Sequence, residues 1–157
     1  MDSIIITSDT LTVALRLGLA TVLGAAIGLN REMSLKPAGM RTHALVALGA
    51  ALATHIGLQL AQPGVGDTAA PGRIIQGIVA GIGFIGGGAI LHRREGASVE
   101  GLTTAASIWV VAATGVAAGA GLWRAAVLTV LFSLLLLAVG RFERVVRRIG
   151  AGTDADD

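Results

Sequence analysis

The sequence predicts an all-α integral membrane protein with five transmembrane helices. Hydrophobic residues make up 54% of its 157 residues and charged residues 14%, whereas a soluble domain carries about 25% charged residues to keep its surface in water. The mean hydropathy is +0.77. Long apolar stretches also recur along the chain with almost no polar face, which disfavours the alternative of a soluble helical bundle.

The apolar stretches have the lengths that membrane spans need. They cover residues 11–29, 44–61, 74–91 and 102–140. Each of the first three matches a hydrocarbon core of about 30 Å, at about 1.5 Å per helical residue. The last would extend roughly 60 Å as one helix, so we expect it to cross twice. The bend is expected before Trp123 and Arg124, and the fifth helix then covers about 121–140.

The pattern changes after residue 140. Phe142, Val145, Val146 and Ile149 recur at helical spacing among arginines, which predicts a short amphipathic segment along the inner headgroups. Residues 150–157 are small and acidic, and we expect them to be disordered. The predicted domains are therefore a transmembrane domain over 1–149 and a disordered acidic tail over 150–157.

The basic residues predict how the chain is oriented in the membrane. Nine of the twelve lysines and arginines fall in the loops at 30–43 and 92–101 and in the C-terminal tail. Because the positive-inside rule places such segments in the cytoplasm, the N-terminus is expected outside and the C-terminus inside. The sequence pI of 10.4 then reflects topology, and a nucleic-acid partner is not expected.

The two predicted cytoplasmic loops resemble each other. Both contain an Arg-Glu pair and then a Gly-apolar-x-Thr run, at 31–32 and 39–42 in the first loop and at 94–95 and 101–104 in the second. This predicts that helices one and two and helices three and four are parallel repeats, with the fifth helix added. Thr42 and Thr104 are expected to cap the second and fourth helices. Chance similarity of two short charged loops is the alternative.

The repeated loops also predict a charged cytoplasmic vestibule that binds an ion or a partner. Glu32 and Glu95 follow helix C-termini, where an acid is unfavourable unless it is paired, and the nearby arginines are the candidates for that pairing. The alternative is that these residues serve only as helix caps and surface ion pairs. The residues proposed for the vestibule are Asn30, Arg31, Glu32, Arg41, Thr42, Glu95, Thr103 and Thr104.

A second set of polar residues, the outer polar group, is predicted toward the outer side: Arg16, His55, Gln59, Arg73 and Gln76. Hydrogen bonds between helices are one interpretation, and a proton-linked His55 is the other. No metal site is predicted, because the other two histidines are expected on the cytoplasmic side. No nucleotide-binding loop, zinc-ligand spacing or catalytic serine motif indicates an enzyme or a cofactor.

Pairs of glycines four residues apart predict close helix packing. Packing within the chain is the first interpretation of these pairs, and a homodimer face is the second. A third is a helix unwound around residues 86–88, whose carbonyls would face a cation. The pairs are Gly24 and Gly28, Gly77 and Gly81, and Gly83 and Gly87, and Gly115 and Gly119 repeat the spacing.

Four segments carry a family resemblance. They are GAAIGLNRE at 24–32, KPAGMRTHALVALGA at 36–50, RIIQGIVAGIGFIGGGAIL at 73–91 and GLTTAASIWVVAATG at 101–115. Together they resemble the MgtC/SapB family of bacterial inner-membrane proteins, which implies a five-helix membrane domain. Many members carry a C-terminal cytoplasmic domain similar to ligand-binding ACT domains, which we do not expect here. Some members have Asn where this chain has Thr103.

The resemblance implies a protein associated with survival under magnesium limitation and with virulence. We therefore expect a non-enzymatic inner-membrane protein, linked to magnesium limitation or acid stress, that binds and modulates other membrane proteins. The expected partners are the lipid bilayer, an F-type ATP synthase, a cation pump or another inner-membrane protein, and a second copy in a homodimer. The alternative is a small ion transporter or channel built on the duplicated helices. A transporter or channel would be distinguished by an aqueous pathway between the outer polar group and the vestibule.

Overall fold

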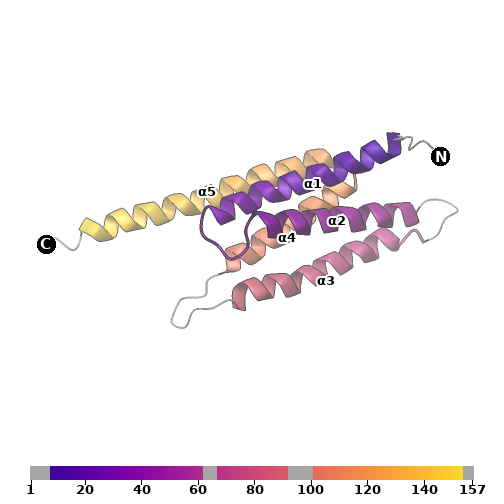
Figure 1. Ribbon diagram of the computed structural model, residues 1–157. Coiled ribbons are helices and arrows are strands. Elements are labelled where there is room, and N and C mark those ends of the chain that lie inside the picture. The colour runs from indigo at the N-terminus through magenta and orange to yellow at the C-terminus, as the bar shows by residue number, and fades with distance from the viewer. Residues whose placement is uncertain (1–7, 62–66, 92–100, 154–157) are drawn as a thin grey trace.

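A computed structural model describes residues 8–61, 67–91 and 101–153, which form five α-helices. They are α1 (Ser8–Glu32), α2 (Met40–Leu60), α3 (Ala70–Leu91), α4 (Leu102–Gly119) and α5 (Trp123–Thr153), and they run side by side as an elongated bundle (Figure 1). The first four are long and apolar enough to cross a membrane, and 123–139 is a shorter apolar stretch in α5. The predicted fold class, an all-α membrane protein with five helices, is confirmed.

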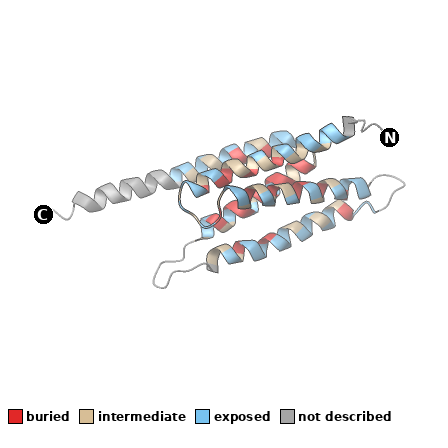
Figure 2. Ribbon diagram, in the orientation of Figure 1, coloured by how far each residue is buried: buried red, intermediate tan, exposed pale blue. Residues whose placement is uncertain are grey.

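The helix α4 lies at the centre of the bundle. It contacts α1, α2, α3 and α5, whereas α3 packs only against α2 and α4 among the described helices. Half of the apolar span of α4 is buried, against 11% of the span in α3. Figure 2 shows buried positions where α1, α2 and α4 face one another. The main apolar core includes Ile27 of α1, Ala47 and Ala51 of α2, and Val111 of α4.

The contacts between helices agree with two related helix pairs. α1 touches α2 and α4, and α3 likewise touches α4 and α2, while α5 packs against α1 and α4. Gly39 and Gly101 occupy equivalent positions, because each immediately precedes a helix, α2 or α4. Their backbones differ, however, since φ is −102° at Gly39 and 108° at Gly101. The duplication therefore stays a prediction, which this arrangement fits.

Gly101 joins the start of α4 closely to the end of α3. Its positive φ is one that glycine adopts without the steric cost that a side chain adds. A Cβ at this position would also lie 2.5 Å from the Ala89 carbonyl oxygen and 3.0 Å from Ile90 Cα. Any other residue at 101 would therefore be strained and would push α3 and α4 apart.

Two of the expected helix boundaries and shapes differ from the sequence prediction. α3 is one continuous helix through residues 86–88, so the interpretation of an unwound segment there is wrong. α5 continues without a break past Gly140 to Thr153 and so includes residues 150–153 of the predicted tail. The Arg, Glu and Ala residues in this stretch favour helix and extend it beyond the apolar part. Residues 154–157 lie outside the described part of the chain.

The glycine pairs of α1 and α4 lie where helix backbones meet. A Cβ at Gly24 would be 2.6 Å from the carbonyl oxygen of His43, and one at Gly28 would be 2.6 Å from Met40 Cα. Gly115 and Gly119 meet the backbone of α2 in the same way. α2 therefore lies between two glycine-bearing helices, and both contacts depend on the missing side chains.

The glycine pairs of α3 behave differently. No atom of another described helix lies within 4 Å of the place where a Cβ would stand at Gly77, Gly81, Gly83 or Gly87. The interpretation of these four glycines as packing points within the chain is therefore wrong. The physical reason is the position of α3 on the flank, where these residues face away from the bundle.

Candidate functional site

A buried polar network joins α1 and α4 at the end of the bundle that carries the loop 33–39, here called the loop end. Arg31, in the last turn of α1, is only 3% exposed. Its Nη2 atom donates a hydrogen bond of 2.7 Å to Oγ1 of Thr104, which is fully buried in the first turn of α4. Burying a guanidinium is costly unless its charge is compensated by hydrogen bonds or counter-charge, so this contact fixes the relative position of the two helices.

The network continues to α2 through His43, which is also fully buried. Its Nδ1 atom lies 2.9 Å from the carbonyl oxygen of Gly39, and its Nε2 atom lies 3.0 Å from Oγ of Ser107. Ser107 Oγ in turn donates a 2.7 Å hydrogen bond to the carbonyl oxygen of Thr104. Three helices thus meet in one chain of hydrogen bonds.

This chain satisfies His43 in both of its protonation states. Because the Gly39 carbonyl can only accept, Nδ1 carries a proton in either state. When the imidazole is neutral, Nε2 accepts the hydroxyl proton of Ser107. When it is protonated, Nε2 donates to Ser107, whose own proton then goes to the Thr104 carbonyl. A single hydroxyl rotation therefore accommodates the gain or loss of one proton.

The close approach of α1 and α2 brings His43 within hydrogen-bonding distance of α4. A Cβ at Gly28 would lie 2.9 Å from Cβ of His43, so no larger residue fits opposite the histidine without a shift of the backbone. With α2 so close to α1, the imidazole reaches across to Ser107 of α4 while staying shielded from solvent.

Glu32 caps α2 from outside the helix. Its Oε2 atom accepts a 2.9 Å hydrogen bond from the backbone N–H of Met40, the first residue of α2. A carboxylate is stabilised there by the partial positive charge of a helix N-terminus. The N-cap residues of α2 and α4 are Gly39 and Gly101, without a side-chain cap bond, so the prediction that Thr42 and Thr104 cap these helices is wrong.

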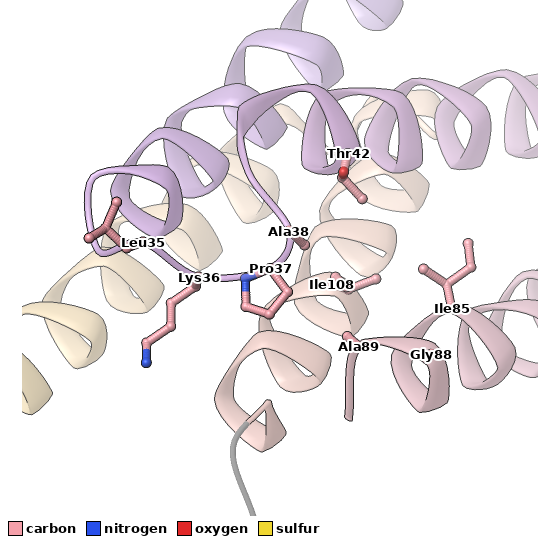
Figure 3. Close-up of a pocket in the computed structure, with 9 residues that line it drawn as sticks. All are labelled: Leu35, Lys36, Pro37, Ala38, Thr42, Ile85, Gly88, Ala89 and Ile108. Atoms are coloured by element: carbon pink, nitrogen blue, oxygen red, sulfur yellow. The ribbon is translucent and has the colours of Figure 1, made fainter. Parts of the chain in front are cut away.

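A cavity of about 390 Å³ lies beside the network, between the loop 33–39 and the ends of α3 and α4. Figure 3 shows Lys36 and Pro37 on the loop side and Ile85 and Ala89 on the opposite side. Thr42 of α2 also lines it, and Leu35, beside Lys36, is 94% exposed with a φ of 54°. In the parts of the chain that the structure describes, no three His, Asp or Glu side chains gather as a metal site would require.

The comparison with known families gives the identity of this bundle. Residues 17–145 match the profile of the MgtC family. The chain belongs to the MgtC family. No solved structure matches the fold of this MgtC family member.

Curated relatives extend the comparison. Protein SrpB of Synechococcus elongatus is 44% identical over 150 residues, which cover 88% of this chain and 79% of SrpB. The putative magnesium transporter YhiD of Escherichia coli is 39% identical over 139 residues, covering 80% of this chain and 59% of YhiD. Protein MgtC of Salmonella typhimurium is 43% identical over 121 residues, 75% of this chain and 49% of that protein. This chain therefore spans about three fifths of the length of YhiD and about half the length of MgtC.

The structure brings together only some residues of the predicted vestibule of this MgtC family protein. Arg31 and Thr104 are bonded directly, and Glu32 and Thr42 lie nearby at the start of α2. Arg41 and Thr103 are exposed, and no ion pair with Glu32 is recorded among the described residues. The carbonyl oxygen of Asn30 accepts a hydrogen bond from Ser34 within the turn that ends α1. Glu95 lies outside the described residues.

The residues of the predicted outer polar group do not gather at one place. Arg16 reaches the end of α4, where Nη1 lies 3.3 Å from the carbonyl oxygen of Gly119. Arg73 instead forms an exposed ion pair with Asp67, which also accepts from the N–H of Ala69 before α3. The described parts of α1 and α3 do not touch, so Arg16 is separated from α3, the helix of Arg73 and Gln76. His55 and Gln59 belong to α2, which touches both α1 and α3.

Sequence reasoning missed His43 and Ser107 as members of the site. His43 was assigned to the cytoplasmic loop region, whereas it is the fourth residue of α2 and faces α4. The signal lay at a boundary, because His43 directly precedes the apolar stretch 44–61 and α2 begins three residues earlier, at Met40. An ionisable residue inside a membrane helix marks a functional position. Ser107 gave no such signal, since a serine in an apolar helix commonly bonds to its own preceding turn.

Proposed function

We propose that this protein is a non-enzymatic inner-membrane protein of the response to magnesium limitation or acid stress, which acts by binding and modulating another membrane protein. The observation that carries this proposal is the closed middle of the bundle. There Gly115 and Gly119 press against the backbone of α2 at Ala47 and Ala51. An ion moving between the two ends along this seam would have to part backbones that already touch.

The polar groups agree with a modulating role. Arg31 and His43 lie at the loop end of the bundle, and Arg16 lies at the other end. The apolar core, including Ala20 and Val111, fills the space between them. The cavity at the loop end shares no lining residue with the cavity beside Arg16 at the other end, so the two are separate features of the structure.

The flank of α3 is the surface that best suits a partner helix. Its glycines at 77, 81, 83 and 87 are open, and Phe84 is 88% exposed. Small residues let another transmembrane helix approach its backbone closely. The proposed partners are an F-type ATP synthase, a cation pump or another inner-membrane protein, and a second copy of this chain would use the same face. We also propose that the N-terminus lies outside the cell and the C-terminus in the cytoplasm.

A matched pair of substitutions tests this surface. Gly81→Leu places a large side chain on the open face of α3, while Gly18→Leu does the same on α1, where no atom lies within 4 Å of the added Cβ. Both proteins should fold and reach normal membrane abundance. In a strain that depends on this protein for growth in low magnesium, Gly81→Leu is expected to fail and Gly18→Leu to grow. Equal growth of the two strains would remove α3 as the partner surface.

The competing function is ion transport, and the name of the YhiD relative favours it. A transporter would have to open the seam at Ala47 and Ala51 in a second conformation. A measurement of magnesium transport by the purified protein therefore separates the two functions.

A further inference from the structure

A second cavity lies at the end of the bundle where α4 turns into α5 over residues 120–122, here called the turn end. Its volume is about 350 Å³, and α1 and the start of α5 form most of its wall. Leu15, Leu19 and Trp123 give it an apolar lining, and Arg16 contributes a positive charge. The partner-binding function proposed above makes no use of this cavity.

The local backbone holds the guanidinium of Arg16 in this place. Nη1 donates to the Gly119 carbonyl at the end of α4. Gly121 has a φ of 82°, and a Cβ at that position would come 2.9 Å from Nη2. Gly121 therefore provides both the turn and the room for the charged group. A guanidinium has five N–H donors, and in the described chain only the bond to Gly119 is recorded for Arg16.

The ends of the helices indicate that the cavity lies at the level of a membrane surface. α4 ends at Gly119 and α5 begins at Trp123, so the chain reverses its direction there and leaves the apolar spans. Trp123 is 54% exposed, and the guanidinium of Arg124 lies 5.2 Å from the centre of its ring. Trp side chains concentrate where the hydrocarbon region meets the lipid headgroups.

A ligand that matches this lining needs an anionic group beside an apolar one. A guanidinium binds phosphate through two parallel hydrogen bonds, which an ammonium does not reproduce. Leu15, 65% exposed, and Leu19 offer apolar surface next to that charge. A second cation, Arg124, favours a headgroup with net negative charge. A free phosphate ion would leave the apolar walls without a partner.

We propose that this cavity binds an anionic phospholipid, with its phosphate on Arg16 and an acyl chain against Leu15, Leu19 and Trp123. The site lies at the opposite end from the polar network, and it stands independently of the partner-binding function proposed above.

The two tryptophans of the chain allow a direct test. Trp109→Phe leaves Trp123 as the fluorophore beside the cavity. Trp123→Phe leaves Trp109, which lines an apolar groove between α3 and α4 without a charged residue. Each protein is reconstituted into phosphatidylcholine vesicles that contain brominated phosphatidylglycerol or brominated phosphatidylcholine at equal mole fraction, and quenching gives the relative association constant of the two lipids.

We expect a preference for phosphatidylglycerol in the Trp109→Phe protein and none in the Trp123→Phe protein. Adding Arg16→Gln to Trp109→Phe should lower that preference about fivefold, the loss expected for one cation near a lipid surface. If this variant does not reconstitute, Arg16→Lys, which keeps the charge without the planar fork, should lower the preference at least in part.

Three results would overturn the proposal. The first is equal quenching of Trp123 by the two lipids. The second is a preference that the Arg16 variants leave unchanged, which would mean that Arg16 only holds the end of α4. The third is release of the quenching by millimolar inorganic phosphate, which would assign the site to a free anion instead of a lipid.

Discussion

Replacing one glycine by alanine should destabilise the protein at one position and not at another, depending on what faces it. At Gly115 a Cβ would lie 2.9 Å from Ala50 Cβ and 3.0 Å from the carbonyl carbon of Ala47, and still closer to the Ala47 oxygen. Two of these atoms belong to the backbone of α2, so no side-chain rotation relieves the contact. At Gly81 the Cβ meets open space. Both residues lie inside apolar helices.

The magnitude follows from two terms. Gly→Ala favours a helix by about 0.5–1 kcal/mol at either position, because glycine loses more backbone entropy on folding. Overpacking a well-filled interface costs about 1–3 kcal/mol and applies only at Gly115. The helix term cancels in the comparison, so Gly115→Ala should be less stable than Gly81→Ala by about 1–3 kcal/mol. Each kcal/mol corresponds to about 2–4 °C in Tm for a domain of this size.

Thermal unfolding of the two purified variants in the same detergent, followed by circular dichroism, measures this difference. Gly119→Ala, whose Cβ would lie 2.8 Å from Ala51 Cα, should behave as Gly115→Ala does. If Gly115→Ala melts at or above the temperature of Gly81→Ala, the close contact between α2 and α4 is not present in the protein. That result would also remove the argument for a closed seam.

Three further comparisons concern the polar network. Ser107→Ala should lower the free energy of unfolding by about 1–3 kcal/mol, because the buried ring nitrogen of the histidine loses its partner. Ser133→Ala removes only a bond to its own helix and should cost less. Equal losses for the two variants, measured by unfolding in detergent, would contradict the network. Thr104→Val should destabilise the protein by up to about 1.7 kcal/mol. Thr54→Val should destabilise it less, because Thr54 bonds only to its own preceding turn. A larger loss of stability in Thr54→Val than in Thr104→Val would refute the link between α1 and α4. Glu32→Ala should lower the free energy of unfolding by about 0.5–2 kcal/mol, because α2 loses its cap. Glu32→Gln should lower it less, because an amide oxygen still accepts a hydrogen bond from the N-terminus of the helix. Unchanged stability of both variants would show that the cap is unimportant.

The sequence was sufficient for the fold because the evidence for spans is carried by length and composition. The double length of the stretch 102–140 required a bend, and the structure places it at residues 120–122. The far end of α5 was less predictable. Gly140 was read as a terminus, but helix-favouring residues follow it and the helix continues to Thr153.

The sequence could not distinguish which glycine pairs are contact points. Gly24 and Gly28 have the same spacing as Gly77 and Gly81, yet only the first pair faces another helix. The spacing shows that one face of a helix carries small residues. The position of the helix in the bundle determines whether another helix packs against that face. That position depends on the packing of all five helices together.

The site was predicted in part for a similar reason. Arg31 and Thr104 were both named, but their contact across 73 positions depends on the packing of α1 against α4. The cap of α2 was assigned to Thr42 by local pattern, whereas Glu32 reaches it from the preceding helix. Local rules for caps consider only the residues adjacent to a helix end, and a tight loop brings a more distant side chain to the same donors.

Magnesium flux through the purified protein tests the central claim most directly. The protein is reconstituted into vesicles that hold a trapped magnesium-sensitive dye, a magnesium gradient is imposed, and an ionophore added at the end shows that the vesicles are sealed. The closed seam at Ala47 and Ala51 predicts uptake equal to that of protein-free vesicles. Saturable uptake above that level, abolished when Gly115→Leu obstructs the seam, would contradict the account and establish a transporter.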